Sequence, residues 1–557
     1  MKTKRILSAL MALLLMASLP VTAFAEEYNI DQGSITVSAD STGQYVTQVG
    51  GVQNYQQTTE TVITQTDSST ATSNTITVTT TGDAVAEFTL QEVNIEASGD
   101  AIAIGDSSAE ITLESDNKLY SKSGSAVHVS GGNATITGSG SLEAEIGVDN
   151  ENAKIGSHES EDMSGSIHIT GNATVTMENT LGGGDGAAIG SGHKGDMSGS
   201  ILIDGNSNVA ASSQRDGAAI GSGYFGDMSG SITIGGSAHV TAESDNDGAG
   251  IGSGDNGDMS GSIMIGGNAK VTAESEDEGA GIGTGEDGDF TGAVVIKDNA
   301  HVTAESDDDG AGIGSGENDD FTGIVVIRDN AWVEATGDGG AQDIGRGEDG
   351  ESGGATVVIG QNTTVNATRG KVDNEIHIDV STDENGTYTV TSATEGVTVG
   401  NILYGSKKTL PTEPGTYTVT CVLTQGKKTY TVPVGELVIP EPETAGDTQS
   451  APLYRVTDKD GKNISYKTEQ KDGVLTITVD ADFAVLTGTL SGISTLKARG
   501  TEKIVFVTKD ATSTFALADL LEKGSMGDTY KLTHDGADIT FTLGAKNTDV
   551  SDILEKA

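Results

Sequence analysis

Acidic residues recur in two turns of a repeated unit, and their spacing favours the binding of a divalent cation. One turn precedes a GAGIGSG-like segment and the other follows it. Equivalent positions of stacked units lie about 4.8 Å apart, where two unit charges repel by about 1 kcal/mol in water. The first turn carries Glu243, Asp245, Asp247, Glu274, Glu276, Asp277, Glu278, Glu305, Asp307, Asp308 and Asp309; the second carries Asp255, Asp258, Glu286, Asp287, Asp289, Glu317, Asp319 and Asp320.

Calcium is the cation that suits these columns of carboxylates. Its bonds to oxygen, about 2.3 to 2.6 Å long, allow one ion to bridge carboxylates of adjacent units. The alternative left open is a set of solvated turns that keep the protein soluble and block edge association. We therefore expect a calcium cofactor with ligands among Asp247, Asp258, Asp289, Asp309 and Asp320.

A second set of side chains has the chemistry of a glycan-binding surface. His239, Lys270, His301 and Trp332 occupy one position of successive units, next to a valine that is expected to point inward. Because side chains alternate along a strand, the four should point outward. We predict that they contact carbohydrate, with packing of Trp332 over the last coils as the alternative.

A polysaccharide lyase would need a basic residue that removes the proton next to a uronate carboxylate, and a cation that neutralises the acid. The basic residues of the repeat are scattered over different turns and form no cluster that would bind an acidic polymer. Lyase activity is therefore the less favoured alternative to a non-catalytic role. These residues are Lys154, Lys194, Arg215, Lys270, Lys297, Arg328 and Arg346.

The acidic turns belong to a unit of 31 residues that is written out five times between residues 186 and 340. A fixed period of this size is typical of a solenoid, in which each repeat stacks on its neighbours. Looser copies precede it from about Asn152 and follow it to Gly370. The glycines that open the five units are Gly186, Gly217, Gly248, Gly279 and Gly310.

Columns of β-branched residues indicate three short strands and three turns in each unit. The aliphatic residues occur in short runs with period-two alternation, separated by Gly, Asp, Asn and Ser. One column includes Ile251, Ile282 and Ile313, and a column of Met and Phe is expected at a corner. Each unit is thus predicted to be one coil of a parallel β-helix with Ile and Val stacked inside.

Composition limits the partners. Lys and Arg number 31 and Asp and Glu number 82, so the net charge of −51 argues against nucleic acid and anionic membranes. The single cysteine, Cys421, cannot form an intramolecular disulfide and is expected to be a buried small hydrophobe. We expect a monomer that binds a polysaccharide or a cell-surface glycan.

The chain begins with the features of a secretory signal peptide in residues 1–25. A basic start, the apolar stretch 6–19 and a small-residue cleavage site at 23–25 indicate export. The protein is therefore expected outside the cell, secreted or on the cell surface, with no membrane insertion after cleavage.

The remaining boundaries follow from shifts in pattern. Residues 26–75 are expected to form a cap with irregular first coils, and residues 76–370 the parallel β-helix. Residues 371–440 contain four alternating segments separated by turn signals, and this pattern predicts a small β-domain. Residues 441–450 are a linker by composition. Residues 451–557 are predicted to be β-rich, with a helix within 514–524.

The stretch GSAVHVSGGNATITGSGSLEAE, followed by GAGIGSG-type coils, resembles the carbohydrate-binding β-helix family of clostridia and other gut Firmicutes. The resemblance covers roughly residues 28–370 and implies an exported protein with a right-handed pectate-lyase-like helix. Some members are associated with calcium, cellulose or pectin. The PTEPGTYTVT run at 411–420 is similar to Ig-like modules of bacterial surface proteins.

Together these features predict an all-β protein. It has a right-handed parallel β-helix of 31-residue coils, a small β-sandwich and a C-terminal β-rich α+β domain. The expected function is that of an exported, non-catalytic carbohydrate-binding or adhesin-like surface protein assisted by calcium. The alternative is a structural spacer that displays the C-terminal domains, since no feature of the repeat argues against that role.

Overall fold

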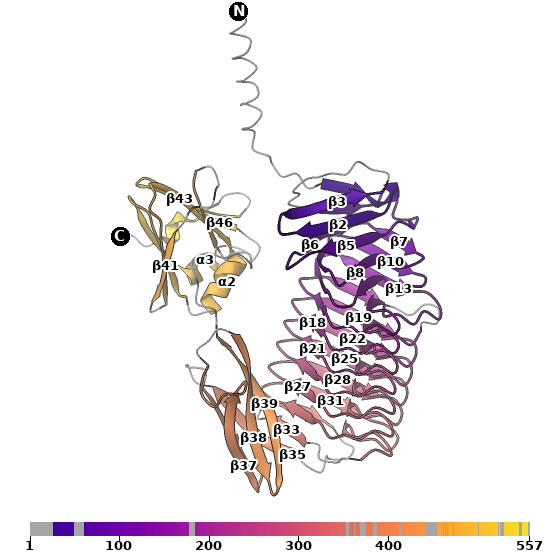
Figure 1. Ribbon diagram of the computed structural model, residues 1–557. Coiled ribbons are helices and arrows are strands. Elements are labelled where there is room, and N and C mark those ends of the chain that lie inside the picture. Colours follow the sequence, from indigo (N-terminus) through magenta and orange to yellow (C-terminus); the bar gives the residue numbers. More distant parts are fainter. Residues whose placement is uncertain are drawn as a thin grey trace, which may run out of the picture. The chain divides into compact units, whose positions relative to one another are not determined.

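A computed structural model describes residues 26–439 and 454–554 of the chain (Figure 1). Within the first range it leaves out 50–60, 178–183, 352–355, 361, 368–374, 383–386 and 412–414. Within the second it leaves out 460–461, 463, 465, 472, 499–500, 522, 524–528 and 545–547. The predicted signal peptide and the linker 441–450 lie outside the described residues. The chain divides into two compact units, 1–439 and 440–557.

The first unit is a parallel β-solenoid of about 13 coils, in agreement with the sequence prediction. Three sheets run along it, and a strand of each coil pairs with the equivalent strand of the next (Figure 1). Sheet A, with 14 strands, contains β1 (Glu26–Asn29), β4 (Thr61–Thr64), β6 (Ala86–Gln91), β9 (Ser108–Leu113), β12 (Asn133–Gly138), β15 (Ser166–Ile169), β18 (Ser200–Ile203), β21 (Ser231–Ile234), β24 (Ser262–Ile265), β27 (Ala293–Ile296), β30 (Ile324–Ile327), β33 (Thr356–Gly360), β35 (Glu375–Thr382) and β36 (Tyr388–Ser392).

The other two sheets have 12 and 10 strands. Sheet B contains β3 (Gly43–Gln48), β2 (Ile35–Asp40), β5 (Ile76–Thr80), β8 (Ile102–Gly105), β11 (Val127–Val129), β14 (Ile155–Gly156), β17 (Ile189–Gly190), β20 (Ile220–Gly221), β23 (Ile251–Gly252), β26 (Ile282–Gly283), β29 (Ile313–Gly314) and β32 (Ile344–Gly345). Sheet C contains β7 (Asn94–Ala97), β10 (Asp116–Ser121), β13 (Ser141–Ile146), β16 (Thr174–Met177), β19 (Asn208–Ser213), β22 (His239–Ser244), β25 (Lys270–Ser275), β28 (His301–Ser306), β31 (Trp332–Thr336) and β34 (Thr364–Asn366).

The predicted ladders form the core. Ile251, Ile282 and Ile313 pair in register along sheet B and are fully buried. The corner column of Met259, Phe290 and their equivalents pairs from coil to coil and is also fully buried. Burying a side chain of this size stabilises a fold by about 1.5–3 kcal/mol, so the stacked columns are the main source of stability.

The second residue of each later sheet B strand must be glycine. Gly252 has a φ of 147°, and a Cβ built on it would lie 1.7 Å from the carbonyl oxygen of Gly283 in the next coil. Only a residue without a side chain allows the coils to stack this closely. The recurring Ile-Gly pair is therefore an architectural feature.

Parallel pairing extends to both ends of this unit. β1 pairs with β4, so coiling begins near Glu26, within the span expected to be a cap and irregular first coils. β3 folds back in antiparallel orientation on β2 and occupies the edge of sheet B. At the other end β35 continues sheet A by pairing with β33, and β36 closes that edge as an antiparallel hairpin partner.

The expected β-sandwich within 371–440 is built partly from the solenoid itself. An antiparallel sheet of β37 (Val397–Tyr404), β38 (Gly415–Gln425) and β39 (Lys428–Ile439) shares a hydrophobic core with sheet A. That core contains Val295, Val326 and Val358 together with Cys421. Cys421 is free and buried, as the sequence predicts, and burial raises the pKa of its thiol to about 11.

The second unit is β-rich with two short helices. One sheet contains β40 (Tyr454–Thr457), β43 (Phe483–Thr489), β46 (Thr529–Asp535), β47 (Asp538–Leu543) and β48 (Thr548–Asp549). The other contains β41 (Lys467–Lys471), β42 (Val474–Thr478), β44 (Lys503–Val507) and β45 (Thr512–Ala516). The helix expected within 514–524 is α3 (Leu517–Leu521). α2 (Leu490–Ala498) was not expected, because its LSGISTLKA sequence has no cap or strong helical periodicity.

Candidate functional site

The two acidic turns on either side of each sheet B strand meet along one edge of the solenoid. The backbone N–H of Asp255 donates to the carbonyl of Asp216, 2.7 Å away, and that of Glu286 donates to Asp247 at 2.9 Å. The last residue of one turn thus lies beside the first residue of the other turn in the next coil. We call the two columns joined in this way the acidic edge: Asp185, Asp216, Asp247, Glu278 and Asp309, with His193, Tyr224, Asp255, Glu286, Glu317 and Glu348.

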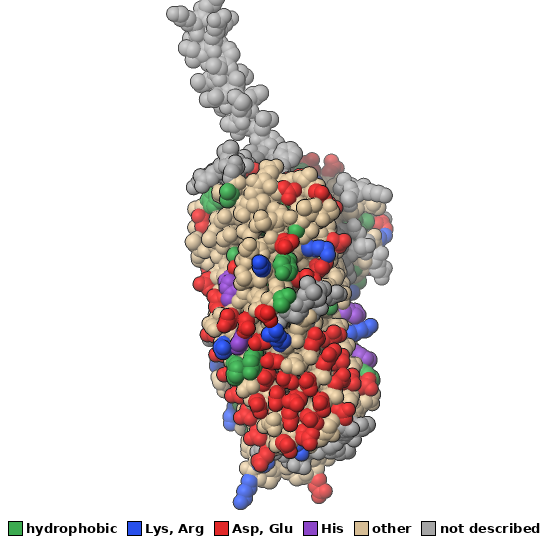
Figure 2. Space-filling model, turned by 90° about the vertical axis from the view of Figure 1, so that its right-hand side faces the viewer, with side chains coloured by type: hydrophobic (Ala, Val, Ile, Leu, Met, Phe, Trp, Pro, Cys, Tyr) green, Lys and Arg blue, Asp and Glu red, His purple; other side chains and the backbone are tan. Residues whose placement is uncertain are grey.

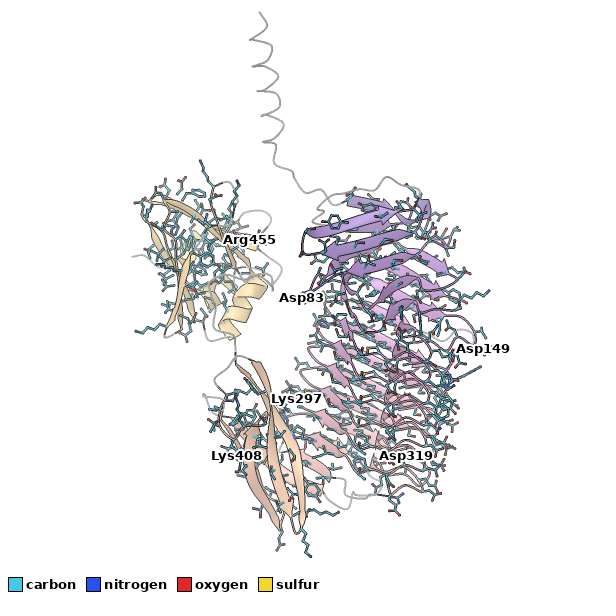
Figure 3. All side chains as sticks on the ribbon, in the orientation of Figure 1. Asp83, Asp149, Lys297, Asp319, Lys408 and Arg455 are labelled. Carbon is cyan, nitrogen blue, oxygen red and sulfur yellow. The ribbon has the colours of Figure 1, made fainter. Side chains whose placement is uncertain are left out.

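The carboxylates of this edge gather in groups of three. Asp216, Asp247 and Asp255 form one group, and Asp247, Glu278 and Glu286 form another; within each, the oxygens lie within 4.8 Å of one another. Asp247 belongs to both groups. Figure 2 shows acidic side chains concentrated over the later coils of this face. Figure 3 places Asp149 and Asp319 along the same side of the solenoid, opposite Lys297.

Burial and mutual repulsion disfavour the ionised form of these groups. Burial raises the pKa of Asp247 to about 6 and that of Asp255 to about 7, and neighbouring carboxylates add to both shifts. Burial, together with a hydrogen bond to Glu278, raises the pKa of Glu286 to about 8. At neutral pH the edge therefore retains protons that a bound cation would displace.

The predicted calcium ligands lie in two different columns. Asp247 and Asp309 belong to the acidic edge. Asp258, Asp289 and Asp320 are exposed and form a separate ladder in which each side chain accepts a backbone N–H from the next coil, at 3.0–3.3 Å. The structure therefore does not bring all five residues together, and the ladder gives its three aspartates a structural role.

Two residues of the second acidic turn are buried. Asp255 is 5% exposed and Asp319 is 2% exposed. Asp319 occupies a position that is glycine in the four preceding coils, among them Gly257 and Gly288, and it accepts a hydrogen bond from the hydroxyl of Thr284 at 3.2 Å. Burial raises the pKa of Asp319 to about 9, so its carboxyl is protonated at neutral pH.

The predicted glycan column exists as a column on sheet C. His239, Lys270, His301 and Trp332 pair in register on β22, β25, β28 and β31. The first three are exposed and Trp332 is half-buried. The rings of His301 and Trp332 stack with centroids 3.8 Å apart and planes within 10°. His301 thus covers one face of the indole.

A second aromatic group lies on the acidic edge, and the sequence analysis did not assign it a role. Tyr224 and Phe225 pack with ring centroids 4.1 Å apart, and Tyr224 stacks on His193 at 5.3 Å. Phe225 is 47% exposed and has a φ of 58°. The sequence signal was available, because Asn256 and Asn318 fill the same position in later coils and Asn suits a left-handed backbone far better than Phe does.

Two of the basic residues considered for a lyase are held by contacts within the solenoid. Lys154 is only 5% exposed, and its Nζ donates to the carbonyls of Met177 and Ser212 in neighbouring coils. Arg215 pairs with Asp149 at 2.7 Å. A buried lysine that bridges coils is out of reach of a polymer, although burial lowers its pKa to about 8.

The fold and this edge define the protein as a parallel β-solenoid with an acidic face, followed by small antiparallel β-sheets. No protein-family model, curated protein or solved structure matches the chain. In the part of the chain that the structure describes, no helix has the length and apolarity needed to cross a membrane.

Proposed function

We propose that this protein is exported and binds a polysaccharide or cell-surface glycan through the acidic edge, without catalysis and with the help of calcium. The observation that carries the proposal is Phe225, an exposed aromatic side chain on a left-handed backbone, directly beside the carboxylates of the edge. Its role as an extracellular or adhesin-like surface protein rests on the sequence.

The position of Phe225 is unfavourable for its side chain in two ways. The backbone of this turn has a positive φ in every later coil, and a left-handed conformation costs a residue with a Cβ roughly 1–2 kcal/mol. Exposure of the ring to water adds to that cost. The equivalent residues with φ between 55° and 63° are Ser160, Lys194, Asn256, Asp287, Asn318 and Asp349. A ring kept at such a position is best explained by a ligand that packs on it.

The chemistry around Phe225 suits a sugar ring. The C–H face of a pyranose packs on an aromatic ring, while its hydroxyls need acceptors. Tyr224 lies next to Phe225, and burial, together with Asp255, Asp216 and Asp185, raises the pKa of its hydroxyl. An aromatic platform and several carboxylates therefore lie within reach of one ligand.

Calcium would assist glycan binding by taking the place of the protons that carboxyl groups of the acidic edge retain. Oxygen-only groups such as Asp216, Asp247 and Asp255 offer the ligands that calcium prefers. The raised pKa values of Asp247 and Asp255 reflect burial and repulsion by neighbouring carboxylates, and a bound cation would relieve that repulsion. A calcium ion held there would lie close to Tyr224, where sugar hydroxyls can complete its coordination.

Binding of insoluble and soluble polysaccharides, measured with and without calcium, tests the proposal. Phe225→Asn removes the ring and places at this position the residue found in two later coils, so the fold should be retained. We expect at least a tenfold loss of affinity in Phe225→Asn. Trp332→Thr is the matched variant on sheet C, because Thr364 fills that column in the next coil.

The two variants separate the alternatives. A loss confined to Trp332→Thr would move the glycan surface to the column of His239, Lys270, His301 and Trp332. Equal binding by both variants and the wild type would contradict both surfaces. Absence of any glycan binding, with or without calcium, would leave the spacer role that displays the C-terminal sheets.

A further inference from the structure

A cluster of two histidines and two carboxylates lies in the early coils, away from the oxygen-only groups of the acidic edge. Asp100 lies two residues before β8, His128 lies in β11, and His158 lies two residues after β14. Because β11 pairs with both β8 and β14, the three residues belong to consecutive coils. The rings of His128 and His158 stack with centroids 3.8 Å apart and planes within 4°.

The two stacked rings share a carboxylate at each edge. At one edge, Asp100 lies 2.7 Å from Nε2 of His158 and 3.6 Å from Nδ1 of His128. At the other edge, Glu161 lies 2.8 Å from Nε2 of His128 and 3.7 Å from Nδ1 of His158. All four ring nitrogens therefore face a carboxylate.

A neutral imidazole cannot satisfy both of its neighbours in this arrangement. It carries one N–H and one lone pair, so one nitrogen of each ring would turn a lone pair toward a carboxylate oxygen. A second proton on each ring would remove this conflict, and so does a metal cation at one edge. The Asp100 edge is suited to hold it, since the ligand atoms of Asp100, His128 and His158 lie within 4.8 Å of one another.

The geometry points to a zinc site formed by Asp100, Nδ1 of His128 and Nε2 of His158. With these nitrogens ligating the metal, each ring keeps its N–H at the far edge, where Glu161 accepts from Nε2 of His128 at 2.8 Å and lies 3.7 Å from Nδ1 of His158. Such an outer carboxylate fixes the tautomer and orientation of metal-bound histidines. Ligation requires the rings to tilt from their parallel stack so that the two lone pairs converge.

The choice of zinc follows from the ligand types. Imidazole nitrogens favour zinc and other transition metals, whereas calcium prefers oxygen alone. The early coils thus offer a site of a different kind from that of the acidic edge. Three protein ligands leave a fourth position for water or for a ligand. The proposal is independent of the proposed glycan binding.

Calorimetric titration of the full chain with zinc chloride tests the site after treatment with a chelator. Millimolar calcium is kept present to occupy the oxygen-only groups. We expect one zinc site, weakened at least tenfold by His128→Gln or His158→Gln. Glu161→Gln should lower the affinity about 10- to 100-fold through its effect on the rings. His239→Gln and His301→Gln are the controls, because both residues are exposed on sheet C and should leave the affinity unchanged.

A second measurement needs no variant. Anomalous diffraction at the zinc edge, on wild-type crystals grown with zinc, should locate the ion between Asp100 and the two rings. The proposal is overturned if the ion lies elsewhere or if zinc does not bind below about 1 mM. It is also overturned if the histidine variants are folded, by circular dichroism and melting temperature, and bind zinc as the wild type does.

Discussion

Three residues of the solenoid differ in type from the residues that occupy the same column in neighbouring coils. Phe225 stands where the later coils have Asn or Asp, Asp319 stands where the four preceding coils have glycine, and His128 pairs with the glycine column of sheet B. Each substitution places a bulky or ionisable group where the backbone favours a small residue. Such positions are where sites are to be expected in a repeat protein.

The glycine column itself gives the first prediction. Gly252→Ala should lower the melting temperature by several degrees, because the added Cβ would lie 1.7 Å from the carbonyl oxygen of Gly283. The control is Gly235→Ala, since no atom lies within 4 Å of the position its Cβ would take. Thermal unfolding followed by circular dichroism measures both. Equal stability of the two variants would mean that the coils can separate at little cost.

A second prediction compares an inward and an edge position of one coil. Ile282 is fully buried, so Ile282→Asp places a carboxylate between stacked coils and should cost several kcal/mol. Glu286→Gln should have little effect at neutral pH, because the raised pKa of Glu286, about 8, already favours its neutral form. Similar melting temperatures for the two variants would contradict the assignment of inside and outside.

At the scale of elements, the outward side of sheet A changes character along the solenoid. The central outward position is Thr233 in β21 but becomes Met264, Val295, Val326 and Val358 in later strands. The last three residues are buried in the core shared with β37–β39. An apolar residue at an outward position is therefore the signal that another sheet covers this face.

This signal gives the third prediction. Val326→Asp should destabilise the protein by several kcal/mol, because it buries an unpaired charge beneath β38 and β39. Thr233→Asp changes the same column three coils earlier, at a partly exposed position, and should cost less than about 1 kcal/mol. Chemical denaturation measures both variants. Comparable losses would show that the three-stranded sheet does not protect Val326.

Periodicity was sufficient to predict the coil and its inward ladders. The 31-residue period fixes which residues stack, and burial of Ile251 and its equivalents follows from alternation alone. The covering of Val326 by another sheet was missed, because only the inward-facing residues of runs such as Val-Val-Ile were used in the prediction. The meeting of the two acidic turns was also missed, because the two-residue length of the sheet B strands is not apparent from GAGIGSG.

The candidate site was predicted less completely than the fold for the same reason. Placement of Asp247 and Asp309 on one edge, and of Asp258, Asp289 and Asp320 on another, depends on how each turn folds back. The spacing of hydrophobic residues along the sequence does not determine how such a turn folds back. The cluster of Asp100, His128 and His158 joins less regular coils of unequal length, where sequence spacing alone does not align the columns.

At the scale of the whole molecule, the net charge of −51 couples stability to pH through the acidic edge. The folded pKa values of Asp247, Asp255, Glu286 and Asp319 are raised to about 6, 7, 8 and 9. Each is above the ordinary value of a carboxyl group, so the folded state binds more protons than the unfolded state between about pH 4 and pH 9. Stability is therefore greatest at the acidic end of this window and falls as pH rises through these values.

Calcium should oppose that fall, because it replaces the protons that the edge loses. In the presence of a chelator we expect the melting temperature to decrease steadily from pH 5 to pH 9, and millimolar calcium to flatten the curve beyond the effect of sodium chloride at matched ionic strength. A hundredfold excess of calcium over Kd corresponds to about 2.7 kcal/mol of added stability.

Asp247→Asn, which removes the carboxylate common to both groups, should reduce the calcium effect. Asp258→Asn should not, because the amide oxygen of Asn can accept the same backbone N–H. A melting temperature that rises with pH, or an equal calcium effect in both variants, would show that the edge is only a solvated face of the solenoid.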